Sequence, residues 1–240
     1  MAIELPSEVV DFLQFIGINW PNVNEDSVRA LAGHVSDFAS NIDGTHQAAT
    51  QTVQSMGAAY TGASYEQLVE TWTKLSSSHM TELIDGCKVV AEALDVAADA
   101  IVVAKGVAIA ELVALAVSFV ADQAAAALTF GIAEAAEALV VEAAKKCVNF
   151  LEQELEQMII GKVLEAALTP LEGVVAKAVD GLVYKGVAAA LGESGGATGA
   201  SFSMDKEALT QHFQTFQDHA DAVASHAQTL QSNIASVSFE

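Results

Sequence analysis

The sequence is poor in cysteine and in basic residues, and each shortage excludes a class of protein. Two cysteines, Cys87 and Cys147, are too few for a disulfide framework, and both lie in an apolar helical pattern, where we expect buried thiols. Ten Lys and Arg residues against 31 Asp and Glu residues give a formal net charge of -21. Because such a charge repels phosphate, binding to nucleic acid or to an anionic membrane surface is not expected.

Proline and strand signals are also scarce. Only three prolines occur among 240 residues, and the chain is rich in Ala, Val, Leu and Glu, a composition that favours helix. No convincing run of alternating apolar and polar residues is bounded by turn residues. The sequence therefore predicts an all-α fold, with enough chain for one large domain or two small ones.

The N-terminal residues lack the basic region of a secretory signal peptide. The run from Met1 to Phe12 contains no Lys or Arg and several acidic residues. This pattern is not that of a cleaved secretory leader. If the protein leaves the cell, we expect a route that needs no signal peptide.

Two helical patterns open the chain. A short amphipathic helix is predicted to stop at Gly17, and a turn at Trp20 follows it. A long helix is then predicted over 24–56, and either Asn22, paired with Glu25, or Asn24 is the candidate cap. Its apolar and small residues recur at alternating steps of three and four, which is a heptad seam. They are Val28, Leu31, Val35, Phe38, Ile42, Thr45, Ala49, Thr52 and Met56.

This long helix breaks at an aromatic turn between glycines and then resumes. Gly57 and Gly62 bracket the turn, because glycine tolerates the backbone that a reversal needs, and Tyr60 is expected to fold its ring against the helix ends. Ser64 is a candidate cap for the next helix. The stripe of that helix is Tyr65, Leu68, Trp72, Leu75, His79, Leu83, Cys87, Val90 and Leu94. Residues 1–95 are thus predicted to contain a long antiparallel hairpin, on which an elongated helical bundle is built.

The following region, 96–192, is strongly apolar and is predicted to be helical and packed on the hairpin. Its most apolar part, 96–141, is long enough for membrane spans, but charges interrupt it at Lys105, Glu111, Asp122, Glu134 and Glu137. We predict that these charges form a thin stripe that faces water. A buried core helix pair is therefore favoured, and membrane insertion is kept as the alternative.

The tail begins with a flexible linker, 193–203, composed of Gly, Ser, Ala and Thr with little else. Residues 204–240 are predicted to form an amphipathic helix capped by Ser203. Its heptad seam is Phe213, Phe216, Ala220, Val223, Ala227, Leu230 and Ile234. That seam needs a partner, either the N-terminal hairpin or another chain. The candidate partner-binding face comprises Phe213, Phe216, Val223 and Leu230.

Three histidines, His212, His219 and His226, recur every seven residues beside that seam. Residues at this spacing lie ~10 Å apart along a helix, too far to share one metal ion, so we expect solvated flank positions. Their joint protonation below about pH 6.5 is predicted to change the stability of this helix.

The sequence contains no recognisable catalytic signature. It has no nucleophile elbow, phosphate loop, zinc-protease motif or cysteine pair with metal spacing. His46 and His79 lie on or beside the hairpin stripe, where half-buried, satisfied histidines are expected rather than a catalytic pair. The sequence therefore predicts a protein that is not an enzyme and that needs no cofactor or metal.

The hairpin tip resembles that of the WXG100 family of type VII secretion substrates, which places Trp-x-Gly in the turn of a helical hairpin. Tyr60 to Gly62 stands for that motif here, with Tyr in place of Trp. The run from Leu5 to Ala32 is similar to the WXG100-like N-terminal domains of actinobacterial polymorphic toxins, including the mycobacterial channel-and-toxin proteins. The resemblance covers Leu5 to Trp72 well, the apolar middle only in character, and not the tail.

This resemblance implies export by a type VII apparatus, with the helical region as a targeting, scaffold or delivery module. Trp20, Tyr60, Gly62 and Trp72 would then be a structural signature, and the partner would be a small WXG100 protein, the secretion apparatus or a second copy. The family's Tyr-x-x-x-Asp/Glu export signal has no match here, since Tyr60, Tyr65 and Tyr184 are each followed four residues on by a non-acidic residue.

Two further hypotheses stay open. The apolar region resembles that of channel-bearing toxins, so a membrane-inserting pore or delivery protein is the second. The third is a cytoplasmic, immunity-like protein that binds a basic partner through its acidic surface.

Overall fold

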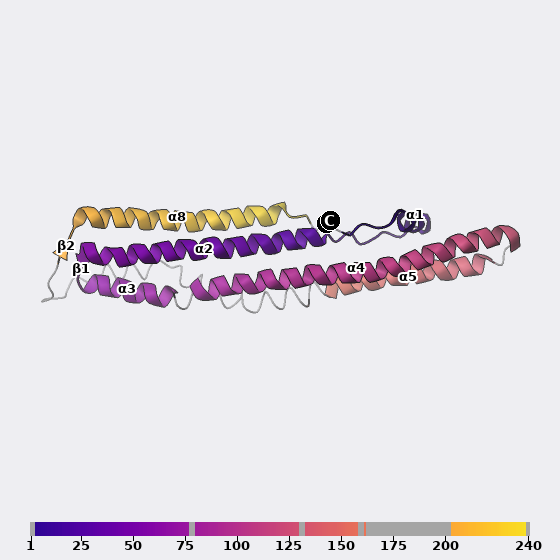
Figure 1. Ribbon diagram of the computed structural model, residues 1–240, viewed down its shortest axis with the longest axis horizontal. Coiled ribbons are helices and arrows are strands. Elements are labelled where there is room, and N and C mark those ends of the chain that lie inside the picture. The colour runs from indigo at the N-terminus through magenta and orange to yellow at the C-terminus, as the bar shows by residue number, and fades with distance from the viewer. Residues whose placement is uncertain (1–2, 77–79, 130–132, 158–160, 162–202, 239–240) are drawn as a thin grey trace. The chain divides into compact units, whose positions relative to one another are not determined.

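The structure is a computed structural model of the chain, and it describes residues 3–76, 80–129, 133–157, 161 and 203–238; for 122–129 and 133–137 only the backbone is described. Within these residues the chain forms six helices and two short strands (Figure 1). They are α1 (Ser7–Ile16), α2 (Glu25–Ala59), β1 (Tyr60–Thr61), α3 (Ala63–Leu75), α4 (Thr81–Thr129), α5 (Ala133–Gln157), β2 (Ser203–Met204) and α8 (Lys206–Ser236). The prediction of an all-α fold is confirmed.

The starts and stops of the first two helices follow from single residues. Gly17 ends α1 with a left-handed backbone (φ 68°), and its N–H donates to the carbonyls of Leu13 and Gln14. The Asn24 side chain accepts hydrogen bonds from the N–H groups of Asp26 (3.0 Å) and Ser27 (3.2 Å), which caps α2. Both boundaries agree with the sequence prediction.

The predicted reversal at the hairpin tip is confirmed. Helix α2 ends at Ala59, the chain turns through β1 and Gly62, and α3 begins at Ala63, one residue before the predicted cap. The second helix of the hairpin differs from the prediction, because α3 ends at Leu75 and α4 begins only at Thr81. Ser76 and Met80, the described residues next to the gap at 77–79, have π-helical backbone. His79 lies outside the described residues.

A short antiparallel pairing at the tip was not predicted. Tyr60 pairs with Met204 and Thr61 with Ser203, and the N–H of Asp205 donates to the carbonyl of Ala59 (2.7 Å). The Asp205 carboxylate then caps α8 by accepting from the N–H groups of Glu207 (3.1 Å) and Ala208 (3.0 Å). Helix α8 therefore starts at the tip, two residues later than the Ser203 cap predicts.

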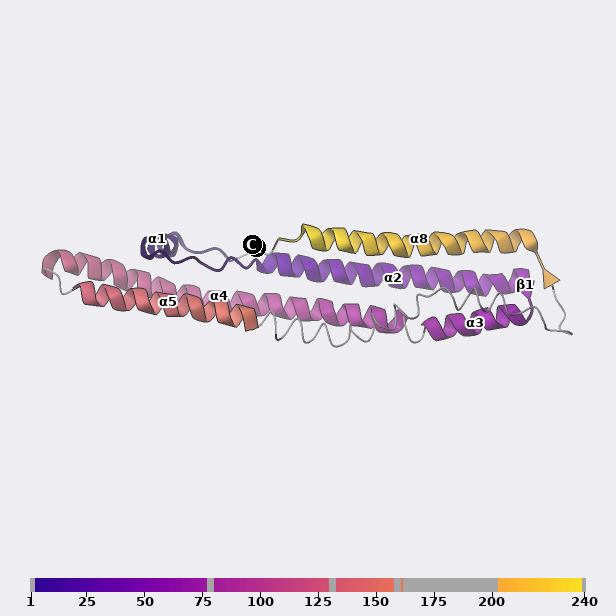
Figure 2. The ribbon, with the colours of Figure 1, turned by 180° about the vertical axis from the view of Figure 1, so that it is seen from behind.

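The chain divides into two compact units. The first comprises the described residues within Met1–Ala30, Ala93–Glu165 and Val237–Glu240, and the second those within Leu31–Glu92 and Ala166–Ser236. In the first unit α4 and α5 lie side by side in both ribbon views (Figures 1 and 2). In the second unit side-chain contacts join α2 to both α3 and α8.

Only one face of α4 is buried in the core of the first unit. Ile101, Leu112 and Phe119 on that face are buried, and the Phe119 ring lies 5.2 Å from the ring of Phe12 on α1. The opposite face of α4 carries valines that are mostly exposed to solvent, for example Val103 at 66%. The predicted buried helix pair is thus only half buried.

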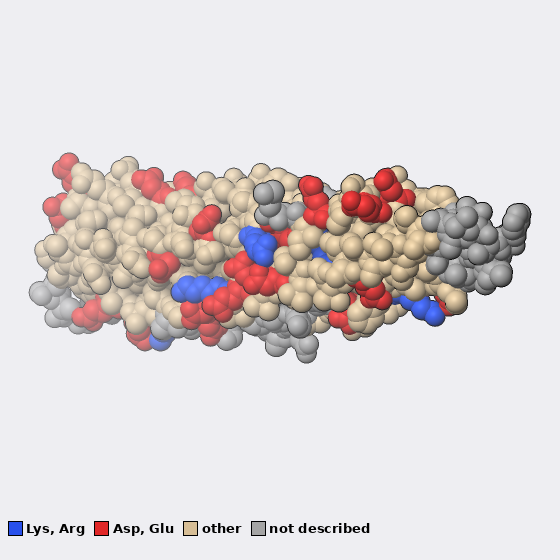
Figure 3. Space-filling model, turned by 45° about the vertical axis from the view of Figure 1, so that its right-hand side comes forward, with Lys and Arg blue, Asp and Glu red and all other residues tan. Residues whose placement is uncertain are grey.

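Lys105 also departs from the prediction of a water-facing charged stripe, because it is only 2% exposed. The reason is a buried partner from α2, described below. On the face drawn in Figure 3, acidic side chains are scattered and outnumber the basic ones, with broad uncharged areas between them.

Candidate functional site: the hairpin tip and two polar anchors

An aromatic cluster holds α2, α3 and α8 together below the tip. The Trp72 ring stacks on His46 at 5.0 Å with an interplanar angle of 21°, and the Phe216 ring meets it edge-on at 5.3 Å. The Trp72 indole N–H donates to Thr50 Oγ1 (2.9 Å), and the Thr50 hydroxyl donates to the carbonyl of His46 (2.9 Å). We call His46, Thr50, Trp72 and Phe216 the Trp72 cluster.

The two glycines of the tip make room for two tyrosines. A Cβ on Gly57 would lie 2.6 Å from the hydroxyl of Tyr65, which donates to the carbonyl of Gln54 (3.3 Å). A Cβ on Gly62 would lie 3.3 Å from the hydroxyl of Tyr60, and Gly62 has φ 158° and ψ 170°, which favours glycine. The glycine spacing noted in the sequence therefore fits close contacts with aromatic rings.

Histidines line the contact between α2 and α8. His226 Nε2 lies 3.1 Å from Thr45 Oγ1, and His219 Nε2 lies 3.2 Å from Thr52 Oγ1. The Thr52 hydroxyl already donates to the carbonyl of Ala48 (3.1 Å), so His219 Nε2 donates to Thr52. The expectation of solvated flank positions is wrong for His219 and His226, which are half-buried. The signal that we missed is that Thr45 and Thr52 are also seven residues apart.

The predicted partner-binding face of α8 is not evenly buried within its own unit. Phe216 joins the Trp72 cluster, Val223 and Leu230 are half-buried, and Phe213 is 48% exposed. The physical reason is that the sequence contains two overlapping heptad stripes, one through Phe213 and one through Phe216. Only the second lies in the unit's interior, and binding of another chain by these residues stays a prediction.

The predicted signature residues do not form a single cluster. Tyr60, Gly62 and Trp72 belong to the second unit, where the tip and the Trp72 cluster place them. Trp20 is half-buried in the segment between α1 and α2 and belongs to the first unit.

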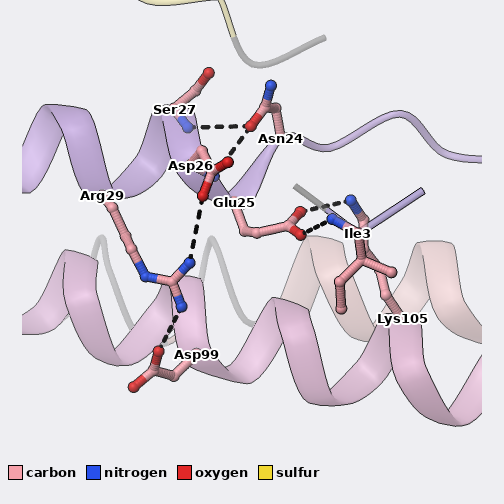
Figure 4. A network of polar contacts seen from close by, with 8 residues as sticks. All are labelled: Ile3, Asn24, Glu25, Asp26, Ser27, Arg29, Asp99 and Lys105. Atoms are coloured by element: carbon pink, nitrogen blue, oxygen red, sulfur yellow. Dashed lines mark hydrogen bonds and ion pairs between the residues drawn. The ribbon is translucent and has the colours of Figure 1, made fainter. Parts of the chain in front are cut away.

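A buried ion pair anchors the first unit (Figure 4). Lys105 Nζ on α4 donates to Glu25 Oε2 on α2 at 2.7 Å, with the two side chains 3% and 0% exposed. The backbone N–H of Ile3 donates to the other carboxylate oxygen of Glu25. Burial alone would raise the pKa of Glu25, but the hydrogen bonds from Lys105 and Ile3 outweigh it, so this pKa lies below its usual value.

A second polar contact extends this network along the surface of the same two helices. Arg29 donates to Asp99 on α4 at 2.7 Å and lies 3.7 Å from Asp26. The Asp99 side chain is 77% exposed, so this pair contributes little to stability, whereas the buried pair fixes how α2 and α4 meet. Two residues 80 positions apart carry no sequence signal that could have predicted their pairing.

Neither the Trp72 cluster nor the network around Glu25 and Lys105 has the layout of a catalytic or metal site. Among the described residues no group of three or more His, Cys, Asp or Glu side chains is placed to hold a metal ion. Burial raises the pKa of both thiols, and for Cys147 burial together with the charge and hydrogen bond of Glu111 raises it to about 11. A thiol with a raised pKa is a poor nucleophile.

The family is decided by a comparison with known protein families. A family model described as a WXG100 like domain matches residues 2–147. The chain belongs to the WXG100-like family. No curated protein and no solved structure matches it.

The WXG100-like match runs from the start of the chain into α5 and includes the tip, Trp72 and the buried ion pair. WXG100-like domains are generally non-catalytic, and the match indicates a helical protein related to type VII secretion. Helix α8, with Phe216 and its histidines, lies outside the matched residues.

The WXG100-like domain also includes a long apolar helix, α4. Among the described helices, α4 is long and apolar enough to cross a membrane over Thr81–Ala121 by length and composition, with a mean hydropathy of 2.3 in its most apolar window. Only 28% of that window is buried.

Acid is expected to destabilise the second unit through His46. Burial lowers the pKa of His46 below 6.5, against a smaller opposite effect of Asp43, and its buried Nδ1 has no hydrogen-bond partner among the described residues. Below pH 6.5 His46 is therefore protonated in the unfolded chain but still neutral in the folded chain. The free energy of unfolding falls as the pH is lowered, until the pH passes the folded pKa of His46. Thermal melts at pH 7.5 and 5.5, followed by Trp72 fluorescence in a Trp20→Phe background, measure this loss.

A His46→Phe variant provides the control for that experiment, because it keeps an aromatic ring beside Trp72 but cannot titrate. The pH dependence should shrink in this variant. If the melting temperature falls equally in both proteins, His46 is not the source of the acid sensitivity.

Proposed function

We propose that this WXG100-like protein is a non-catalytic substrate of a type VII secretion apparatus, or a targeting and scaffold module of a secreted toxin. The observation that carries the proposal is the helical hairpin that reverses at Tyr60 to Gly62, inside the residues that the family model matches. In this proposal the protein leaves the cell without a signal peptide, and its partner is the secretion apparatus or a small WXG100 protein.

Secretion from a bacterium with a type VII system tests this function. We expect the full chain in the culture filtrate of the parent strain and its absence from the filtrate of a strain without the secretion ATPase. A lysis marker controls for leakage. Equal amounts in both filtrates, or retention of all protein in the parent strain, would contradict the proposal.

A pair of glycine variants tests whether the tip carries recognition. Gly62→Val places a side chain against Tyr60, whereas a Cβ at Gly44, in the middle of α2, would meet nothing within 4 Å. Both exchanges add the same side chain, and both variants should accumulate in the cell. We expect export to fall at least severalfold for Gly62→Val and to persist for Gly44→Val; equal export of the two would remove the tip from the recognition surface.

Membrane insertion of α4 is a second candidate function, supported by the exposed, apolar span Thr81–Ala121. Against it, the span contains Lys105, whose charge would have to leave Glu25 and enter the bilayer. Leakage of dye from vesicles of zwitterionic lipid at pH 7.5 and 5.0 distinguishes the two functions. Release of dye would support insertion, and intact vesicles at both pH values would exclude it for the protein alone.

A further inference from the structure

The solvent-exposed face of α4 carries an ordered pattern that neither the core nor the ion pair explains. Seven exposed residues of the first unit, which we call the α4 stripe, occupy this face; they are Val103, Gly106, Val107, Ala110, Val113, Ala114 and Val117. At 3.6 residues per turn all seven project from the side of the helix opposite Ile101, Leu112 and Phe119. The stripe is therefore a helix face that is exposed and has no partner among the described residues of its own unit.

The α4 stripe reads the same in both directions. Counted from Ala110, valines stand at three and seven residues on either side, and a small residue, Gly106 or Ala114, stands four residues away on each side. A pattern that is symmetric about one residue is complementary to itself when two helices run antiparallel. An isologous contact between two copies requires this property, since each residue then meets its counterpart in both directions.

Size alternation along the stripe also suits this pairing. In an antiparallel pair centred on Ala110, Val107 of one copy lies beside Ala114 of the second copy, and Val113 lies beside Gly106 of the second copy. Valines thus fill the spaces that the small residues leave, and the two backbones approach closely, as they do at small-residue helix contacts. Among the described residues nothing requires a glycine at 106, because a Cβ there would meet nothing within 4 Å.

Few charged side chains lie near the α4 stripe to oppose an antiparallel contact between two copies. Between residues 103 and 121 the sequence has only two charged residues, Lys105 and Glu111. Lys105 is buried against Glu25, and Glu111 interacts with Cys147 of α5. The repulsion between two chains of charge -21 is therefore long-ranged and is screened by salt.

We propose that the α4 stripe binds the α4 stripe of a second copy of this chain in an antiparallel, two-fold symmetric pair centred on Ala110. From Val103 to Val117 the stripe is ~21 Å long at 1.5 Å per residue, which is short for a standard interface of ~800 Å² per partner. The association is accordingly weak, depends on concentration and strengthens with ionic strength. A bilayer is the competing occupant of an apolar face, but it requires neither the symmetry nor the small residues.

Sedimentation of the full chain over a concentration series tests the pairing. The wild type is expected to shift from monomer to dimer, and Gly106→Leu and Ala110→Leu to weaken the dimer by about tenfold or more, although both variants are more apolar. Gly44→Leu is the matched control, because Gly44 is also exposed in mid-helix with nothing within 4 Å of an added Cβ, and its dimerisation should be unchanged. Circular dichroism checks that each variant keeps its helix content.

Disulfide trapping tests the direction and register of the pair. Ala110→Cys should form a dimer with itself, since the two copies meet there within the ~7 Å between Cα atoms that a disulfide allows. Val103→Cys should cross-link only when it is mixed with Val117→Cys. The wild type, whose two thiols are buried, provides the background.

Several outcomes would overturn the proposal. A wild type that stays monomeric at every concentration, leucine variants that associate more tightly, or a Val103→Cys protein that cross-links with itself would each exclude the antiparallel pair. Flotation with zwitterionic vesicles that increases in Gly106→Leu would identify the bilayer as the occupant instead.

Discussion

Replacing Lys105 by Met should lower the free energy of unfolding of the first unit by about 3–5 kcal/mol, the usual cost of leaving one member of a buried ion pair without its partner. Lys105 and Glu25 are almost completely shielded from solvent and lie 2.7 Å apart, so the remaining carboxylate would have neither water nor a cation beside it. Denaturant unfolding followed by fluorescence of Trp20, in a Trp72→Phe background, reports the first unit.

Two further variants distinguish the effect of burying the ion pair on stability from the effect of having an ion pair at all. Lys146→Met breaks a pair of similar length, 2.8 Å, whose side chains are 75% and 61% exposed, and it should change stability far less than Lys105→Met. The double variant with Met at both positions 25 and 105 should recover much of the stability, because no charge remains buried. Equal losses for Lys105→Met and Lys146→Met would show that burial of the pair is unimportant.

The same pair makes a prediction about acid. Because the pKa of Glu25 is lowered by folding, the pair stabilises the unit above pH 4.5 and that stabilisation is lost as the pH falls through the folded pKa. In Lys105→Met the unpaired Glu25 can take up a proton, so the difference between wild type and variant should shrink as the pH approaches 4. A constant difference from pH 7 to pH 4 would contradict this account.

Replacing Trp72 by Ala should destabilise the second unit by about 2–4 kcal/mol, somewhat less than for a fully buried tryptophan. The change removes the stacking on His46, the edge contact with Phe216 and the hydrogen bond to Thr50. Because Phe216 is one of the residues that hold α8, amide hydrogens of α8 should exchange faster, which mass spectrometry of peptides from 206–236 can measure.

Trp72→Phe is the control, because it keeps an aromatic ring between His46 and Phe216 but loses the donor to Thr50. It should cost about 0.5–1.5 kcal/mol, the net value of one hydrogen bond. If hydrogen exchange in α8 is unchanged in Trp72→Ala, then the histidine contacts with Thr45 and Thr52 are sufficient to hold that helix.

Features set by neighbouring residues could be predicted from the sequence. The stop of α1 depends on Gly17, the start of α2 depends on the Asn24 side chain, and the reversal depends on the glycines around Tyr60. Each of these depends on backbone conformations and hydrogen bonds within a few residues, which propensities capture.

Features that depend on distant contacts could not be predicted. The strand pair at the tip is two residues long on each side, too short to produce a periodic pattern. Lys105 looked like a water-facing interruption of an apolar helix until α2 placed Glu25 beside it. For α8, the heptad pattern allowed two faces, and only the positions of Thr45 and Thr52 on α2 select the one that turns inward.

The residues that the family model matches are not all the residues that the fold of the tip needs, because the chain returns to the tip after the match has ended. The family match ends at residue 147, but Ser203 and Met204 supply the strand beside Tyr60 and Thr61, and Phe216 supplies one side of the Trp72 cluster. A fragment cut at 147 would therefore lack these contacts and leave the tip's backbone groups and one edge of Trp72 uncovered. Recombinant work on this protein should keep the C-terminal helix.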